Sequence, residues 1–150
     1  MEPLEVGSAA PSIPGVSLRG GPVGLFFYKV TCPTCQLAAP TMSAFERAYP
    51  GRVVGIGQDP PEALEGFAAE YAMSIRSVRD LPPYDVSNAY GIVSVPTLFL
   101  VDGGGVVRDV VGAWDREGFN RVSCGLAELV GAEPVVVSDG SDGRPAFKPG

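Results

Sequence analysis

Two cysteines three positions apart, Cys32 and Cys35, lie in the stretch VTCPTCQLAAP, residues 30–40. Such a pair can be half of a metal site, a structural disulfide or a redox pair. The chain has three cysteines and no histidine, so a zinc ion would have to draw its ligands from thiolates and carboxylates. A disulfide across so short a loop removes little entropy from the unfolded chain. The spacing therefore favours redox chemistry, and neither a metal nor a cofactor is expected.

The place of the pair in the chain indicates how this chemistry would work. An apolar run at residues 21–30 has the length and flanks of a buried strand, and a helical pattern follows at residues 33–49. Unpaired N–H groups and the helix dipole at a helix start favour a thiolate, which lowers a cysteine pKa from about 8.5 to between about 3.5 and 7.5. Cys32 is thus expected to be the exposed nucleophile, and Cys35 is expected to resolve the mixed disulfide.

The rest of the chain alternates between strand and helix patterns. Strands are expected at residues 52–57, 74–79, 96–102 and 106–112, with the last two forming a hairpin, and helices at residues 60–71, 85–91 and 115–130. Asp59 is expected to cap the first of these helices, and Asp115 the last. The order predicts an α/β fold with a central, mixed β-sheet flanked by helices on both faces.

Composition and charge set the domain limits and the expected partners. We expect one domain at residues 1–136, with a loosely structured lead-in at 1–22, and a polar, flexible tail at 137–150. The net charge is −6 and the 11 basic residues are scattered, which argues against nucleic acid and anionic membrane surfaces as partners. No apolar run approaches the roughly 20 residues that span a bilayer. With Met1 as the natural start there is no signal peptide, so we expect a cytoplasmic protein. We also expect a monomer.

Several motifs together carry a family resemblance. The strand–CPTC–helix unit, Pro40 inside that helix, and SVPT at residues 94–97 before an apolar strand resemble a thioredoxin-like domain. The fuller pattern adds GSAAPSIPGVSL, RVVGIGQD, FAAEYAM and AYGIVSVPTLFLVDGGGVV. It is similar to the redoxin group, which includes peroxiredoxins of the AhpC/TSA type and thiol–disulfide reductases of the cytochrome-maturation type. The resemblance covers residues 6–130.

The resemblance implies a thiol–disulfide oxidoreductase with a thioredoxin-like fold and antioxidant activity. Its substrate would be a protein or small-molecule disulfide, and a thiol would donate the electrons. Pro96 would be the cis-proline beside the cysteines, and Val95 would offer backbone groups to a substrate chain. Thr31, Pro33 and Thr34 would complete the substrate-binding surface around the pair.

Some positions depart from the patterns of related proteins. Thr31 stands where many relatives have tryptophan, Phe26 where thioredoxin has a buried acid, and Ala38 where some cytochrome-maturation reductases have glutamate. Water or a distant carboxylate is then expected to handle protons. Of the peroxiredoxin motif Pro-x-x-x-Thr-x-x-Cys, the proline and threonine are replaced by Tyr28 and Cys32. A thiol peroxidase using both cysteines and a thioredoxin-fold binding module with little turnover remain the alternatives.

The third cysteine, Cys124, lies in the last expected helix. At about 100° per residue it falls opposite the apolar face of that helix, on the side of Glu117 and Glu128. We expect a surface thiol that is either inert or a site of intermolecular disulfide formation or glutathionylation.

Overall fold

The computed structural model describes residues 3–150; Met1 and Glu2, on which the expected start of the chain depends, lie outside the described residues. Its elements follow in the order β1 (Val23–Tyr28), α1 (Pro33–Ala48), β2 (Val53–Gly57), α2 (Pro61–Glu70), β3 (Arg76–Arg79), α3 (Asp85–Ala89), β4 (Thr97–Val101), β5 (Val107–Gly112), β6 (Trp114–Asp115), α4 (Arg116–Val130) and β7 (Phe147–Lys148). This order confirms the expected alternation of strands and helices.

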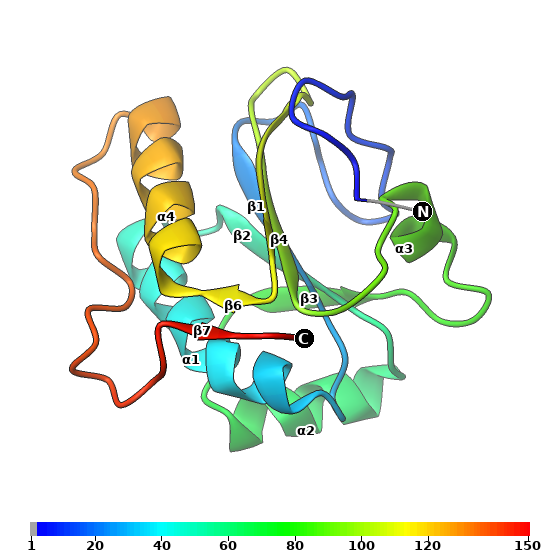
Figure 1. Ribbon diagram of the computed structural model, residues 1–150. Helices are drawn as coiled ribbons and strands as arrows, with labels where there is room; N and C mark the ends of the chain where they lie inside the picture. The colour runs from blue at the N-terminus through cyan, green and yellow to red at the C-terminus, as the bar shows by residue number, and fades with distance from the viewer. Residues whose placement is uncertain (1–2) are drawn as a thin grey trace.

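Five strands form a mixed central sheet in the order β3-β2-β1-β4-β5 (Figure 1). Strands β1, β2 and β3 are parallel, whereas β4 runs antiparallel to both β1 and β5. All six residues of β1 are buried, which explains its continuous apolar sequence: a central strand covered on both faces needs apolar side chains in both directions. Strands β4 and β5 form the hairpin that was expected at residues 96–112, so this prediction is confirmed.

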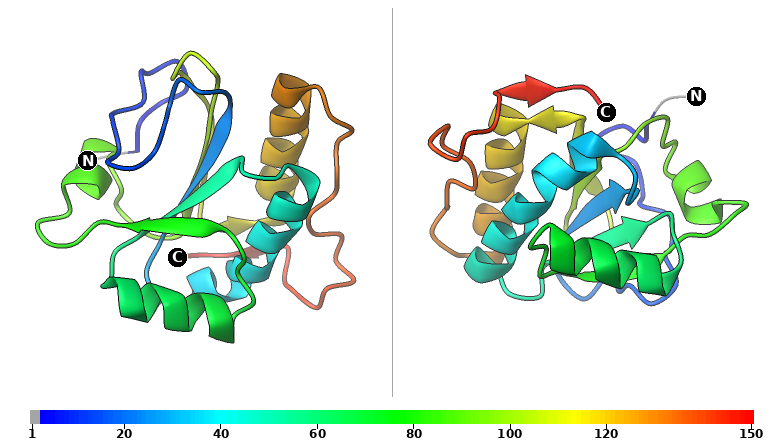
Figure 2. Two further views of the ribbon diagram at one scale, coloured as in Figure 1. Left: turned by 180° about the vertical axis from the view of Figure 1, so that it is seen from behind. Right: turned by 90° about the horizontal axis from the view of Figure 1, so that it is seen from below.

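Two apolar clusters lie on opposite faces of the sheet. Figure 2 (left) shows α1 and α4 on one side of the sheet and α3 with the N-terminal segment on the other. In the larger cluster, Phe26 and Tyr28 of β1 pack with residues of α1, α2 and α4. In the smaller cluster, Leu25 and Phe27 of the same strand pack with Tyr90, which follows α3, and with the N-terminal segment. The sheet is thus covered on both faces, as a thioredoxin-like fold requires. Among residues 3–150, no helix has both the length and the apolar character needed to cross a membrane.

The N-terminal segment is more ordered than the expected lead-in. The backbone N–H of Leu4 donates to the carbonyl of Tyr90, and that of Gly7 donates to the carbonyl of Val107. Ile13 is buried beneath the sheet as part of the smaller cluster. Residues 3–22 therefore act as a cover for one face of the sheet, where the α3 helix is too short to cover it alone.

The start of α2 differs from the expectation. Asp59 does not cap this helix; the N-cap is Pro60, which has no side-chain acceptor, and the helix begins at Pro61. Oδ2 of Asp59 instead accepts a hydrogen bond of 2.9 Å from the backbone N–H of Val30. The carboxylate thus satisfies a backbone donor just past β1 rather than a free donor of its own helix. By contrast, Asp115 caps α4 as predicted, by accepting from the N–H of Gly118.

The C-terminal residues also differ from the expected flexible tail. Strand β7 pairs with β6 in a small antiparallel ladder, and the indole Nε1 of buried Trp114 donates to the carbonyl of Pro145 over 2.7 Å. A buried indole N–H requires an acceptor, and here the tail backbone supplies it. The segment at residues 137–150 thus lies against the domain (Figure 1). The domain boundary expected at residue 136 stays a prediction.

Candidate active site

The two cysteines meet at the start of α1. Cys32 is the N-cap, with extended backbone angles, and Pro33 is the first helical residue, where the missing N–H of proline is harmless. The Sγ atom of Cys32 accepts a hydrogen bond of 3.2 Å from the backbone N–H of Cys35. A cysteine sulfur here takes the place of the usual serine or aspartate oxygen. An N–H donor of this kind stabilises a thiolate more than a thiol, because the acceptor then carries charge.

The environments of the two sulfurs are opposite. Cys32 is partly exposed, whereas the Cys35 side chain is fully buried, and both are free thiols in the structure. Burial raises the pKa of the Cys35 thiol, and the hydrogen bond with Cys32 raises it further. Cys35 therefore holds its proton inside the core, while Cys32 faces the solvent side of the helix start.

The loop before β4 lies beside this pair. Sγ of Cys32 lies 3.5 Å from the carbonyl oxygen of Val95, to which its thiol donates. The peptide bond between Val95 and Pro96 is cis. Pro96 is buried, Val95 is partly buried, and the N–H of Ala113 donates to the carbonyl of Pro96. Residues 63 positions apart in the chain are thus brought together at the end of the sheet where β1 ends and β4 begins.

The three residues next to the cysteines differ in exposure. Thr31 and Pro33 are exposed at the surface around Cys32. Thr34 is 3% exposed, and its hydroxyl donates to the carbonyl of Pro149 over 2.6 Å. The structure therefore places all the residues predicted for this site in one region. It adds a contact with the C-terminal segment that the sequence did not reveal.

The loop between β1 and Cys32 is held by side chains that the sequence analysis did not assign to the site. The amide of Gln36 donates to the carbonyl of Val30, and the carboxylate of Asp59 accepts from the N–H of the same residue. Both contacts fix the backbone two residues before Cys32. The Gln36 contact could have been predicted from the sequence, since a polar side chain in the first turn of a helix can reach the preceding loop. The Asp59 contact could not, because it joins segments that are distant in sequence.

Asp59 is also the carboxylate that acts electrostatically on the buried side of the site. Its negative charge is one of the smaller causes that raise the pKa of Cys35 and of Tyr28, after burial as the largest cause for both. Phe26 and Ala38, at the positions where relatives carry an acid, are both buried and apolar. Whether water or a carboxylate such as Asp59 handles the protons stays a prediction.

Cys124 lies on the exposed face of α4, as predicted from its helical phase. Phe119, Val122 and Leu126 are buried on the opposite face of the same helix.

In the part of the chain that the structure describes, no three histidine, cysteine or acidic side chains gather in an arrangement that could hold a metal ion.

Comparison with known proteins gives a consistent picture. The model of the AhpC/TSA family matches residues 13–110. The thiol-disulfide oxidoreductase ResA of Geobacillus kaustophilus is 29% identical over 109 residues, which cover 69% of this chain and 62% of ResA. The chain thus spans less than two thirds of the length of this relative, and 55% of the ResA of Geobacillus thermodenitrificans.

Solved structures share the fold. Mycobacterium tuberculosis DsbF is 30% identical, with a TM-score of 0.63 over 73% of this chain and 83% of DsbF. The thioredoxin domain of a thiol-disulfide oxidoreductase from Bacteroides vulgatus is 23% identical, with a TM-score of 0.70 over 82% of this chain and 99% of that domain. The predicted thioredoxin-like fold is confirmed.

Proposed function

The chain belongs to the AhpC/TSA family, and from that premise we propose that it is a thiol–disulfide oxidoreductase. Its substrates are protein or small-molecule disulfides, and a thiol donor restores the reduced pair. The observation that carries the proposal is the contact between partly exposed Cys32 and buried Cys35 at the start of α1. The activity in the names of ResA and of the Bacteroides vulgatus oxidoreductase supports it.

The reaction proceeds in two exchange steps. In the first, the Cys32 thiolate attacks one sulfur of the substrate disulfide; a Cys32–substrate bond forms, and the other substrate sulfur leaves as a thiolate that takes up a proton. In the second, the Cys35 thiolate attacks Sγ of Cys32, and the remaining substrate sulfur leaves in the same way. Two electrons and two protons pass to the substrate, and the two cysteine sulfurs end as a disulfide. The sulfurs carry both electrons, so the reaction needs no cofactor.

The raised pKa of Cys35 suits the order of these steps. In the reduced protein, burial and the hydrogen bond with Cys32 keep Cys35 protonated, so that it does not compete as a nucleophile. Once Cys32 is bound to the substrate, its sulfur carries no charge. The charge of Cys32 then no longer raises the pKa of Cys35. Formation of the mixed disulfide therefore makes Cys35 easier to deprotonate at the moment when it must attack.

The residues around the pair form the substrate-binding surface. Val95 offers its backbone to an extended substrate chain beside Cys32, since its carbonyl lies 3.5 Å from Sγ. Pro96 shapes the loop that carries this carbonyl. Thr31, Pro33 and Thr34 flank the nucleophile on the α1 side. We further propose that the protein acts as a cytoplasmic monomer and that its reductase activity serves an antioxidant role.

A second candidate is a thiol peroxidase that uses Cys32 as the peroxidatic and Cys35 as the resolving residue. The match to the AhpC/TSA family favours it, because the redoxin group includes peroxiredoxins. Tyr28 and Cys32 stand where the peroxiredoxin motif has proline and threonine, and this favours disulfide exchange instead. Consumption of hydrogen peroxide with dithiothreitol as donor measures the peroxidase activity directly.

Reduction of insulin by dithiothreitol tests the proposed function. The wild-type protein should accelerate the precipitation of reduced insulin chains, and Cys32→Ser should abolish this acceleration. Cys124→Ser is the matched control, because it removes a thiol of the same type from the exposed face of α4. A wild-type protein that gives no acceleration above dithiothreitol alone would point to the binding module or, with peroxide turnover, to the peroxidase.

A further inference from the structure

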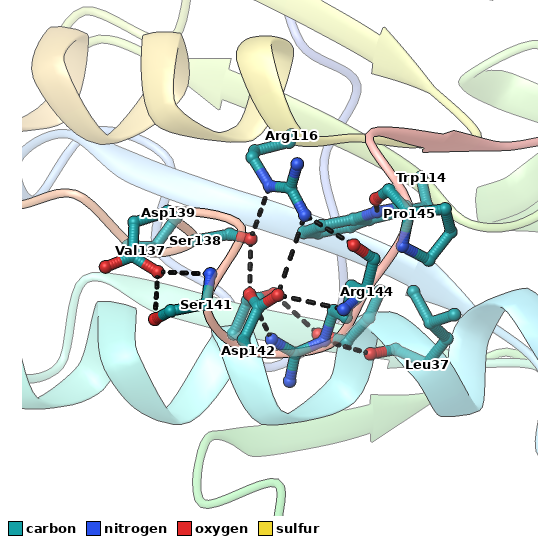
Figure 3. Close-up of polar contacts among 12 residues, drawn as sticks. Leu37, Trp114, Arg116, Val137, Ser138, Asp139, Ser141, Asp142, Arg144 and Pro145 are labelled. Atoms are coloured by element: carbon teal, nitrogen blue, oxygen red, sulfur yellow. Dashed lines mark hydrogen bonds and ion pairs between the residues drawn. The ribbon is translucent and has the colours of Figure 1, made fainter.

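A polar network anchors the segment at residues 138–144 beside α4 (Figure 3). The Ser138 hydroxyl donates to the carboxylate of Asp142 and accepts from Nε of Arg116 over 3.1 Å. The same carboxylate lies 3.6 Å from Nη2 of Arg116 and 2.7 Å from Nη1 of Arg144. The hydrogen bond from Ser138, followed by that from the backbone N–H of Arg144, holds the pKa of Asp142 well below its usual range. The Asp142 carboxylate is therefore ionised at neutral pH, and we call the contacts of residues 138–145 the anchor of the segment.

Arg144 and Pro145 then tie the segment to α1 and to the core. Nε of Arg144 donates to the carbonyl of Leu37 over 2.9 Å, and its guanidinium lies over the Trp114 ring, 5.9 Å from the ring centroid. The indole N–H of Trp114 donates to the carbonyl of Pro145. These contacts direct the following residues toward the first turns of α1.

Beyond this anchor the chain is extended. Strand β7 runs antiparallel to β6, with Lys148 opposite Trp114. The Phe147 side chain is 57% exposed, so this part of the segment is held through its backbone rather than by a buried side chain. The end of the chain passes over the start of α1 (Figure 2, right).

Pro149 and Gly150 reach the surface around the cysteines. The Thr34 hydroxyl, between the two cysteines, donates to the carbonyl of Pro149 over 2.6 Å. Gly150 lies so close to Val95 that a Cβ atom at position 150 would collide with the carbonyl oxygen of Val95. That oxygen is also the partner of the Cys32 thiol. The segment thus lies on the backbone group that we assign to substrate binding.

We propose that the segment Phe147–Gly150 occupies the substrate groove of its own chain, and that an extended polypeptide must displace it before its disulfide reaches Cys32. The identification of this surface as a substrate groove rests on the proposed function. The contacts of residues 147–150 with Thr34 and Val95 are independent of that function. The occupant is an extended backbone with small or proline residues at Thr34 and Val95. The substrate class that fits the same place is therefore an extended, unfolded polypeptide rather than a folded surface.

The division of the segment into two parts makes displacement feasible. The ion pairs and the Trp114 contact lie at residues 138–145, away from the cysteines. Phe147, Pro149 and Gly150 are exposed, and the segment is held by the backbone pairing of the two-residue strand β7 with β6 and by one side-chain hydrogen bond, from Thr34. Segments with few buried contacts open at a small fraction of the global unfolding free energy. Residues 147–150 can therefore leave the groove while the contacts at residues 138–145 stay in place.

Gly150→Ala tests the proposal, since a methyl group at this position collides with the Val95 carbonyl. The full chain is used in a Cys124→Ser background, fully reduced, and the initial rate of reaction with the bulky disulfide dithiobis(2-nitrobenzoate) is measured at pH 7. We expect a rate about fivefold above that of the parent. This is the increase in the population with an open groove if the collision costs the segment the equivalent of one net hydrogen bond, such as the one from Thr34. Gly66→Ala is the matched control: it adds the same methyl group in α2, where no atom apart from its chain neighbours and its own helix backbone lies within 4 Å. Its rate should equal that of the parent.

Arg144→Ala is the second variant, because it removes the contacts with Leu37, Trp114 and Asp142 without touching the groove. It should also accelerate the reaction, and a thermal melt of each variant establishes that the fold is intact. A synthetic peptide of residues 143–150 should slow the reaction of both variants more than that of the parent.

The outcomes separate this proposal from the proposed function. Rates for Gly150→Ala and Arg144→Ala equal to those of the parent and of Gly66→Ala would overturn the occupancy of the groove, whatever the insulin assay shows. Faster reaction in both variants supports occupancy even if insulin is not reduced, in which case only the proposed function fails.

Discussion

The backbone N–H of Cys35 donates a hydrogen bond to Sγ of Cys32 over 3.2 Å, while the Cys35 side chain itself is fully buried. One residue thus supports the nucleophile through its backbone and keeps its own sulfur in the core. This arrangement separates the two thiols by environment although they lie one helical turn apart.

The first prediction concerns thiol reactivity. In reduced Cys124→Ser protein, iodoacetamide at pH 7 should modify Cys32 and leave Cys35 unmodified, because Cys35 is buried and its pKa is raised. Peptide mass spectrometry at increasing reaction times measures both sites. In Cys32→Ser the fast modification should vanish. Faster modification of Cys35 than of Cys32 would reverse the proposed roles.

The second prediction is a pH dependence of stability. Because burial raises the pKa of Cys35 in the folded protein, the folded thiol keeps its proton at pH values at which the unfolded thiol, with a pKa of about 8.5, has lost it. The stabilisation by the protonated thiol is therefore complete below about pH 8.5 and is lost as the pH rises toward the higher folded pKa. The unfolding free energy of the reduced protein should fall by up to about 1.4 kcal/mol per pH unit between about pH 9 and 10.

Urea unfolding of the reduced protein from pH 7 to pH 10 measures this slope. Cys35→Ser is the control, since serine does not titrate in this range and should leave a flatter profile. Burial also raises the pKa values of Tyr28 and Tyr90, but both tyrosines are present in each protein. Equal slopes for the two proteins would mean that Cys35 does not titrate differently in the folded and unfolded states.

The third prediction concerns the start of α4. Asp115 accepts a hydrogen bond of 3.2 Å from the N–H of Gly118, which otherwise has no partner within the helix. Asp115→Ala should lower the unfolding free energy by about 1 kcal/mol, whereas Asp115→Asn keeps an acceptor at the same position and should change it much less. Chemical denaturation of the three proteins measures the difference. Equal losses in both variants would assign the effect to charge rather than to capping.

Much of the fold and the centre of the site could be predicted from local patterns. The apolar run before Cys32, the helical period after it and the hairpin signal after Pro96 each span fewer than about 20 residues, so each could be read without tertiary information. The exposure of Cys124 followed from helical phase alone. The proximity of Pro96 to the cysteines came from the family resemblance, because nothing local links positions so far apart.

The parts that the sequence analysis missed are long-range polar contacts. Asp59 has the spacing of a helix cap, yet its carboxylate accepts from Val30, because the end of β1 leaves a backbone donor nearby. The tail has the composition of a mobile segment, yet Trp114 and Thr34 need acceptors that its carbonyls supply. Composition describes how a segment behaves alone; it does not describe which buried donors elsewhere in the fold require its backbone.

The fourth prediction follows from the two-step exchange. Serine at position 35 fills nearly the same volume as cysteine but cannot attack Sγ of Cys32, so the mixed disulfide with a substrate should persist. Cys32→Ser should form no adduct, because no nucleophile remains at the helix start. If the protein is a peroxidase, Cys35→Ser should instead accumulate sulfenic acid on Cys32 after treatment with peroxide.

The measurement that tests the central claim most directly is the yield of covalent adduct between the reduced protein and insulin on a non-reducing gel. All variants are compared in the Cys124→Ser background, which removes the exposed third thiol. We predict a strong adduct band for Cys35→Ser that dithiothreitol releases, and none for Cys32→Ser. Equal adduct yields from the two variants would contradict the assignment of Cys32 as nucleophile and Cys35 as resolving residue.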